Sequence, residues 1–151
     1  MNEGFVTYEL AVKLREKGFR EKCLAYYDVE DNVGLLYNTQ YTDEALPCQY
    51  TDLLQSHNTG EAETQPDDSG NCVDAPTISQ VMRWLRKKKI IISIFPHPCG
   101  WQADIYKDVH EYYDSEAECY LMHYYKEKTE ISHSYNWLEI YCIQYVLDNL
   151  I

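Results

Sequence analysis

Residues 75–95 read APTISQVMRWLRKKKIIISIF, and this stretch decides how the second half of the chain folds. Thr77, followed three residues later by Gln80, matches a capping box and predicts that a helix begins here. The apolar residues behind the cap recur at helical spacing and form one stripe: Ile78, Val81, Met82 and Leu85. The cations at 86–89 complement the dipole at the end of this helix. The run from Ile90 to Phe95 is too short for another helix and predicts a strand buried on both faces.

The residues after this stretch predict two more strands and a closing helix. Residues 96–100 contain two prolines and a glycine and turn the chain, and apolar residues alternate with polar ones over 101–106, which predicts a hairpin. Residues 119–125 predict a third strand, and the charged segment 126–129 predicts a turn after it. Ser134 is the expected N-cap of a helix that runs to about Asn149. This helix is so apolar around its girth that we expect it to be buried or to pack against a partner chain.

The first half of the chain predicts a helix, a hairpin and an acidic excursion. Residues 8–17 form the helix, with Thr7 as its N-cap and Gly18 after its end. Strands are expected at 23–27 and 33–37, and 41–50 is ambiguous between a short edge strand and loop. Residues 51–74 carry only negative charge and little to bury, which predicts a mobile acidic loop. The fold class is therefore α+β: an antiparallel sheet with helices on one face, in a single compact domain over 1–151.

The net charge of −12 is unevenly distributed. From Cys23 to Met82 the chain has 11 Asp and Glu residues and no Lys or Arg. Such a field repels nucleic acid and acidic lipid, so nucleic acid is not the expected partner. One local exception is a basic cluster beside Trp84, made of Arg83, Arg86, Lys87, Lys88 and Lys89. Dipole complementation and solubility explain this cluster better than nucleic-acid binding does.

The sequence contains no known catalytic signature, such as a phosphate-binding loop or a nucleophile elbow. The closest approach to metal-ligand spacing is His97 with Cys99, with His110 and Cys72 as further candidates, and no second pair lies at zinc-finger spacing. A turn with a surface His and a half-buried Cys is the simpler interpretation. We therefore assign no catalytic, cofactor-binding or metal-ligating residue and expect no cofactor.

The six cysteines are widely spaced and contain no C-x-x-C pair, and we interpret them as buried free thiols. The start of the chain has no secretory pattern, and its longest apolar run is far too short to span a bilayer. These features predict a cytoplasmic protein without a membrane partner.

Tyrosine is the compositional outlier, with 15 copies against 3 Phe and 3 Trp. Three tyrosine pairs, at 26–27, 112–113 and 124–125, would each place one ring on either face of a strand. We expect one ring of each pair to be buried and the other exposed. An exposed, acidic and Tyr-rich sheet face would suit a protein interface.

Two blocks of the sequence resemble a family of small uncharacterised proteins from phages, prophages and mobile elements of Bacteroides-type bacteria. The first block is FVTYELAVKL followed by Gly18-Phe19, and the second, more specific block is A-P-T-x-x-x-V-x-x-W-L-R at 75–86. The resemblance covers about half of the chain and leaves out the acidic excursion. The resemblance implies a mobile-element genomic context and expression in the cytoplasm of a bacterial host cell. The family has no established activity, so the resemblance transfers no functional residue.

The leading hypothesis from the sequence is an accessory protein of a phage or mobile element that binds another protein and has no catalytic activity. The apolar C-terminal helix leaves a homodimer open. One alternative is an acidic DNA mimic that inhibits a host nucleic-acid-binding or defence protein. Another is a small metal-dependent hydrolase that uses His97, Cys99 or His110. A nucleic-acid binder acting through the basic cluster is a fourth.

Overall fold

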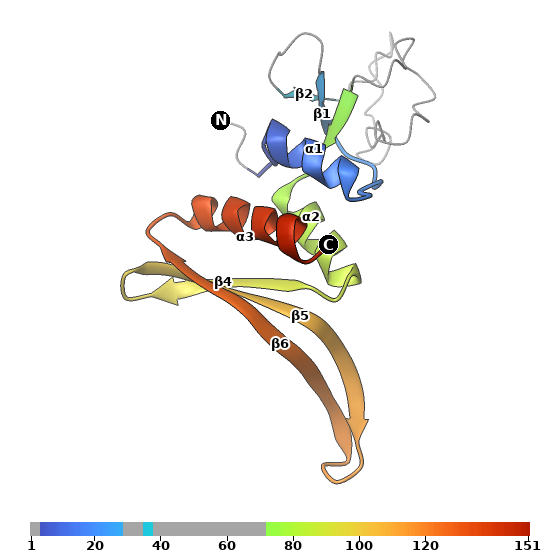
Figure 1. The fold of residues 1–151 in the computed structure, drawn as a ribbon, viewed down its shortest axis with the longest axis vertical. Helices are drawn as coiled ribbons and strands as arrows, with labels where there is room; N and C mark the ends of the chain where they lie inside the picture. Colours follow the sequence, from blue (N-terminus) through green and yellow to red (C-terminus); the bar gives the residue numbers. More distant parts are fainter. Residues whose placement is uncertain (1–3, 29–34, 38–71) are drawn as a thin grey trace, which may run out of the picture. The chain divides into compact units, whose positions relative to one another are not determined.

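The computed structural model describes residues 4–28, 35–37 and 72–151 (Figure 1). Their contacts divide the chain into two compact units, Met1–Ser79 and Gln80–Ile151. The strands form two three-stranded antiparallel sheets, one in each unit, and helices accompany both. The α+β class predicted from the sequence is confirmed, although the strands make two sheets instead of one. A single domain over 1–151 stays a prediction.

The first unit begins with helix α1 (Tyr8–Glu16), close to the predicted 8–17. The Thr7 hydroxyl accepts a hydrogen bond from a first-turn amide, as an N-cap does. At the other end Gly18 has a φ of +91°, and the Phe19 amide donates to the Leu14 carbonyl at 2.9 Å. This is the hydrogen-bond pattern of a Schellman ending. The predicted cap and stop signals are both confirmed.

The sheet of the first unit has the order β2-β1-β3, with β1 (Ala25–Asp28), β2 (Leu36–Tyr37) and β3 (Cys72–Ala75). The predicted hairpin of 23–27 with 33–37 is confirmed with shorter strands. The predicted loop 51–74 is wrong at its end, because residues 72–74 belong to β3 and pair with β1. Val73 is fully buried there, so strand pairing outweighs the acidic local composition. Residues 51–71 and the ambiguous 41–50 lie outside the described residues.

Helix α2 (Ile78–Lys87) begins directly after Thr77, as the capping box predicts, and ends sharply. Lys89 adopts a φ of +63°, and the Ile90 amide donates back to the Leu85 carbonyl at 3.0 Å. This is again a Schellman ending, here with a lysine in the left-handed position that glycine usually takes. Ile90 is buried, and the chain enters the next strand one residue later.

The sheet of the second unit has the order β4-β5-β6, formed by β4 (Ile91–His97), β5 (Gly100–Asp114) and β6 (Cys119–Ser132). The predicted hairpin across 96–100 is confirmed, with His97 paired to Gly100. The predicted turn at 126–129 is wrong, because β6 continues through it to Ser132. That segment has no turn-forming Gly, Pro or Asn, and its polar side chains bond to a buried carboxylate in β5, described below.

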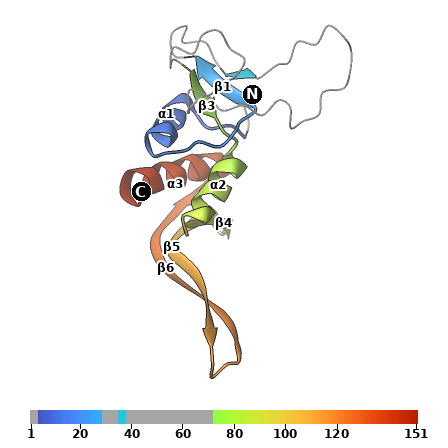
Figure 2. The same ribbon diagram turned by 90° about the vertical axis from the view of Figure 1, so that its right-hand side faces the viewer.

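Helix α3 (Tyr135–Asn149) covers one face of the second sheet (Figures 1 and 2). The Ser134 hydroxyl accepts a hydrogen bond from the Trp137 amide at 3.2 Å, so the predicted N-cap is confirmed. The helix buries one row of side chains: Leu138, Cys142, Ile143, Val146 and Leu147. Ala103 and Ile105 of β5 are buried as well. No helix in the described part of the chain is long and apolar enough to cross a membrane.

Cys99, Cys119 and Cys142 carry free thiols, as expected, but the described cysteines differ in burial. Cys23 and Cys142 are buried, whereas Cys99 and Cys119 are exposed, so the prediction of buried thiols is wrong for the latter two. Cys99 lies in the β4–β5 turn and Cys119 at the far end of the β5–β6 hairpin, where nothing described covers them.

Gly100 is a position where a side chain has no room. Its φ is +128°, and a Cβ built on it would lie 2.7 Å from the Ser132 carbonyl oxygen and 2.9 Å from the Cα of His133. We expect Gly100→Ala to lower the free energy of unfolding by about 2 kcal/mol or more, through backbone strain and this clash. Chemical denaturation followed by tryptophan fluorescence measures it, because all three tryptophans lie in the second unit. The control Cys99→Ala, in the same turn, should change stability by less than about 0.5 kcal/mol.

Candidate interaction surface

The hairpin of β5 and β6 extends well beyond the rest of its sheet (Figures 1 and 2). The last residue of β5 that pairs with β4 is Tyr106. From Lys107 to Tyr125 the two strands pair only with each other among the described residues. We call residues 107–125 the arm. Within the second unit, no third strand pairs with the arm, and most of its side chains are exposed on both faces.

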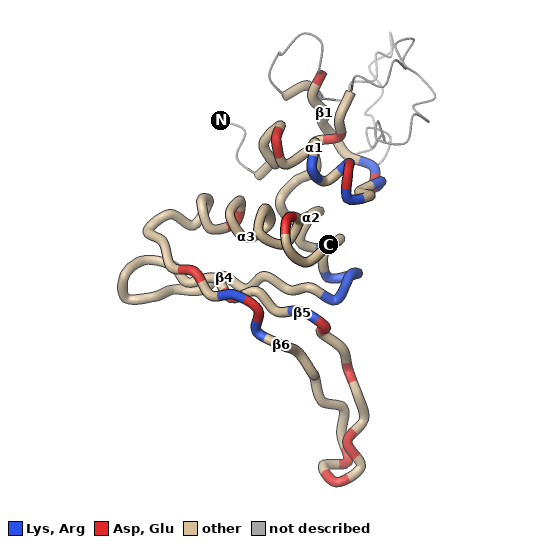
Figure 3. The backbone as a smooth tube through the Cα atoms, in the orientation of Figure 1, with Lys and Arg blue, Asp and Glu red and all other residues tan. Residues whose placement is uncertain are grey.

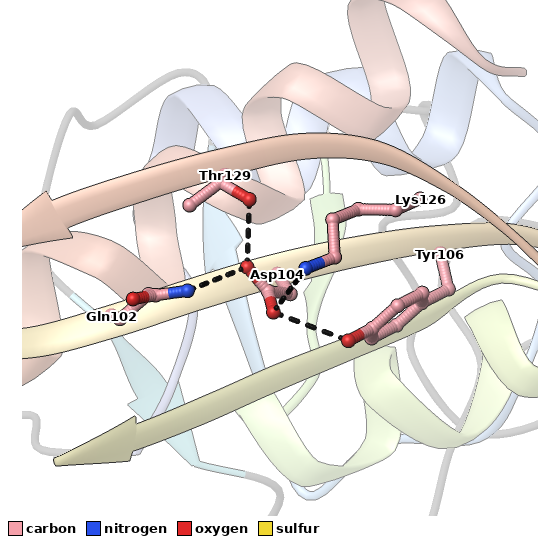
Figure 4. A network of polar contacts seen from close by, with 5 residues as sticks. All are labelled: Gln102, Asp104, Tyr106, Lys126 and Thr129. Carbon is pink, nitrogen blue, oxygen red and sulfur yellow. Dashed lines mark hydrogen bonds and ion pairs between the residues drawn. The ribbon is translucent and has the colours of Figure 1, made fainter. Parts of the chain in front are cut away.

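The base of the arm is held by Asp104, a carboxylate that is 3% exposed (Figure 4). The Thr129 hydroxyl donates to its Oδ1 at 2.8 Å, and Lys126 Nζ lies 3.1 Å from its Oδ2. Gln102 and Tyr106 donate to the same carboxylate, at 3.0 and 3.1 Å. Four side chains from two strands therefore converge on one buried charge at the point where the arm leaves the sheet.

These contacts govern the ionisation of Asp104. Burial by itself would raise the pKa of the carboxyl group, but the hydrogen bonds from its four partners outweigh burial and hold the pKa below its ordinary value of 3.8. The hydrogen bond to Asp104 also raises the pKa of Lys126. Burial, followed by the hydrogen bond to Asp104 and its negative charge, raises the pKa of Tyr106. A carboxylate so fully engaged has little capacity left to act on a substrate, and we assign it a structural role.

Two register shifts at the base bend the arm away from β4. One lies between Ile105 and Tyr106 and the other between Lys107 and His110. Such bulges increase the local bend and twist of a strand pair. The second is secured from outside the ribbon, because the Val109 amide donates to the Lys89 carbonyl at 3.0 Å. An ion pair at 2.7 Å joins Lys107, beside this second shift, to Glu127 of β6, which lies at the first shift.

One face of the arm is aromatic, and we call it the tyrosine face: Glu111, Tyr113, Tyr120, Met122 and Tyr124. These residues share a face because β6 alternates and the register pairs Glu111 with Met122 and Tyr113 with Tyr120. Tyr113 and Tyr120 form an edge-to-face pair with ring centroids 5.3 Å apart, and they are 57% and 67% exposed. Met122 and Tyr124 are exposed too. An exposed aromatic cluster of this kind, on a ribbon with no cover among the described residues, suits contact with another molecule.

The opposite side of the ribbon, which we call the histidine face, carries His110, Tyr112, Leu121, His123 and Tyr125. The register pairs His110 directly with His123 and Tyr112 with Leu121. Tyr112 and Tyr125 are exposed, so both rings of the 112–113 and 124–125 pairs are exposed. The prediction of one buried ring in each of these pairs is therefore wrong. It assumed a sheet packed on one side, whereas nothing described packs on either side of the arm.

The arm is also strongly acidic (Figure 3). Residues 108–125 contain Asp108, Glu111, Asp114, Glu116 and Glu118 and no Lys or Arg, which gives a formal charge of −5. Asp114 shapes the tip, where its Oδ1 accepts hydrogen bonds from the backbone amides of residues 116 and 117. Aromatic rings between uncompensated carboxylates match a partner surface that carries cations.

The residues considered for a metal or hydrolase site are spread over different elements. His97 and Cys99 lie in or beside the β4–β5 turn, where the Cys99 amide donates to His97 Nδ1. His110 lies on the arm, and Cys72 belongs to β3 of the other unit. In the described part of the chain, no three His, Cys, Asp or Glu side chains are grouped as metal ligands.

The buried thiols are poor nucleophiles. Burial raises the pKa of Cys142 to about 12, and burial with the nearby Asp74 and Glu21 carboxylates raises the pKa of Cys23. Both therefore stay protonated at neutral pH, and the thiolate is the reactive form.

The basic cluster at the end of α2 is exposed, but its aromatic neighbour is not. Trp84 is only 7% exposed, and Lys88 Nζ lies 4.7 Å from the centre of its ring. The indole is therefore occupied by a cation–π contact in its own chain and is not presented for stacking on a base.

A second exposed aromatic patch lies where α3 begins. Trp101 meets Tyr135 edge to face, and Trp137 stacks on Tyr141 with centroids 4.8 Å apart. The apolar row of α3 that the sequence analysis considered for a partner chain packs on the sheet of its own unit. A homodimer through this helix stays a prediction.

Sequence reasoning noticed the tyrosine pairs but did not find the arm. The sequence did contain a usable signal. Over 108–125, acidic and aromatic residues occur at both the odd and the even positions, so neither face of a strand in this segment would be uniformly apolar and suited to a core. Comparison of the chain with family models, with curated proteins and with solved structures gives no match, so the surface is interpreted from its own chemistry.

Proposed function

We propose that this chain is a phage- or mobile-element-type accessory protein that acts by binding another protein, with the arm as its contact surface. The observation that carries the proposal is the exposed Tyr113–Tyr120 pair on a ribbon with no described cover. The genomic context rests on the resemblance of residues 75–86, which also leads us to expect a bacterial cytoplasm.

Three properties of the arm support this role. Tyrosine and methionine are enriched in protein interfaces, and a tyrosine side chain loses little conformational entropy on binding. The hydrogen bonds to Asp104 fix the base of the arm, so the arm loses little conformational entropy when a partner binds. The charge of −5 over residues 108–125 selects a partner with a cationic surface and accelerates its encounter.

An acidic DNA mimic is the second candidate, favoured by the same charge. Residues 108–125 and the region from Cys23 to Met82 each carry acidic groups and contain no Lys or Arg. If the partner is a nucleic-acid-binding protein, DNA should compete with the chain for it, and the competition should weaken as salt is raised. If DNA does not displace the chain from its partner, an ordinary protein interface is favoured.

The test compares three tagged proteins as baits in lysate of a Bacteroides-type host, at low and at high salt, with mass spectrometry of the retained proteins. The baits are the native chain, Glu111→Lys on the tyrosine face, and Glu16→Lys at the end of α1, which changes the net charge by the same amount. We expect that at least one lysate protein is retained by the native chain and by Glu16→Lys but not by Glu111→Lys. The reason is that cations on the partner's surface would be repelled by a lysine at position 111. Equal retention by all three baits would contradict the arm as the contact surface.

A further inference from the structure

Two histidines face each other across the arm. His110 of β5 and His123 of β6 are register partners, and side chains of directly opposed residues in an antiparallel pair project from the same face. Their ring centroids are 5.0 Å apart, with 46° between the ring planes. This pair lies on the histidine face and plays no part in the tyrosine contacts that carry the proposed function.

A hydrogen bond fixes the tautomer of His110. Its Nδ1 lies 2.8 Å from the carbonyl oxygen of Asp108. A carbonyl only accepts, so Nδ1 carries the proton and Nε2 of the neutral ring presents its lone pair. An imidazole that donates its other N–H to a backbone carbonyl is the usual arrangement of a metal-ligating histidine. Asp108 holds this carbonyl in place from the bulge, where its φ is +52°.

The second ring is also held in place. His123 packs edge to face against Tyr125, with centroids 4.8 Å apart and planes at 87°. Tyr125 is the next residue of β6 on the same face, so the contact limits the rotation of the His123 ring toward the base of the arm.

The spacing of the rings suits a shared ion. Two imidazoles bound to one ion through nitrogen, with metal–nitrogen distances of about 2.0–2.1 Å and a ligand angle of roughly 90–110°, have ring centroids roughly 4.5–5.2 Å apart. The observed 5.0 Å lies inside this interval. The separation of the two rings is therefore compatible with both binding one ion.

The charge around the pair favours a cation as well. Residues 108–125 carry five carboxylates and no Lys or Arg. The lysines at the base are engaged with carboxylates, Lys107 with Glu127 and Lys126 with Asp104. A divalent ion at His110 and His123 would therefore enter a field of the opposite sign.

We propose that His110 and His123 together bind one divalent transition-metal ion of the class that imidazole prefers, with Zn²⁺ as the representative. Zinc, nickel and copper share this preference. Since no third ligand is grouped with the pair among the described residues, water fills the remaining positions and the site stays open. Such a site is suited to reversible binding and differs from a closed structural zinc site.

The test is a titration of the full chain, labelled with ¹⁵N-histidine, with ZnCl₂, in which NMR follows each imidazole. The exposed thiols Cys99 and Cys119 are first replaced by serine, because thiolates compete for zinc. We expect the signals of His110 and His123 to shift together at one equivalent. His110→Gln and His123→Gln should each weaken zinc binding roughly tenfold or more. His133→Gln, which removes an exposed histidine outside the arm, should leave the affinity unchanged.

Circular dichroism of each variant checks that the fold is retained. If zinc shifts neither ring, or if His110→Gln and His123→Gln bind zinc as tightly as His133→Gln does, the proposal is wrong. This outcome is separable from a failure of the proposed function. The bait experiment repeated with EDTA reports partner binding without metal, and the titration reports metal binding without a partner.

Discussion

Replacing Asp104 with alanine is expected to lower the free energy of unfolding of the second unit by about 3 kcal/mol. The substitution removes a buried acceptor and leaves the Thr129, Tyr106 and Gln102 donors without it, while Lys126, which is half exposed, regains water. Denaturant unfolding followed by tryptophan fluorescence measures the loss. The matched control is Glu111→Ala, which removes an exposed acid of the same ribbon and should cost less than about 0.5 kcal/mol.

The same carboxylate gives a signed dependence on pH. Its pKa is lowered in the folded state, so its contribution to stability is complete above the ordinary value of 3.8 and is lost as the pH falls through the folded pKa. In Asp104→Asn the group no longer titrates. The difference in unfolding free energy between the native chain and Asp104→Asn should therefore shrink as the pH is lowered from about 6 toward 3. A difference that is constant or grows over this window would show that Asp104 is not held ionised by its partners.

The second large effect is expected at the tip of the tyrosine face. The double substitution Tyr113→Ala and Tyr120→Ala should weaken binding of the protein captured by the arm by roughly 100-fold or more, which corresponds to about 2.7 kcal/mol. These two rings are exposed and contact each other, so their removal deletes contact area without opening a core. Calorimetry or surface plasmon resonance with the purified partner measures the change in Kd.

Two controls give this result its meaning. Tyr135→Ala removes an exposed ring outside the arm and should leave the affinity within a factor of about two. The unfolding free energy of the double variant should stay within about 1 kcal/mol of the native value, because no buried side chain is touched. Undiminished binding by a stably folded double variant would remove the tyrosine face from the interface.

Signals that depend on a few neighbouring residues were readable in the sequence. Gly18 predicted the Schellman ending of α1, and Ser134 predicted the start of α3. The turn at 96–100 predicted the β4–β5 hairpin. Each is a local matter, since backbone hydrogen bonds close within a few residues and the side chain at one position decides whether they form. The α+β class followed from the order of such elements.

The tertiary structure decided what depends on distant partners. Residues 72–74 looked like part of an acidic loop, yet they pair with β1 far away in the chain. The segment 126–129 looked like a turn because it is charged, yet Lys126 and Thr129 extend toward Asp104 across the ladder. Neither outcome is visible in local composition, because the hydrogen bonds that stabilise these residues come from the other strand.

The exposure of the candidate interaction surface also depends on tertiary packing. The sequence by itself placed Tyr124 and Tyr125 in a predicted strand and indicated that adjacent tyrosines, there or at 112–113, project to opposite faces wherever they lie in a strand. Whether a strand face is buried depends on what packs against it, and β4 stops pairing at Tyr106. Only the tertiary structure could show that the tyrosines on both faces beyond this point are exposed among the described residues and that His110 lies opposite His123. Cross-strand register is a property of two distant segments and not of either alone.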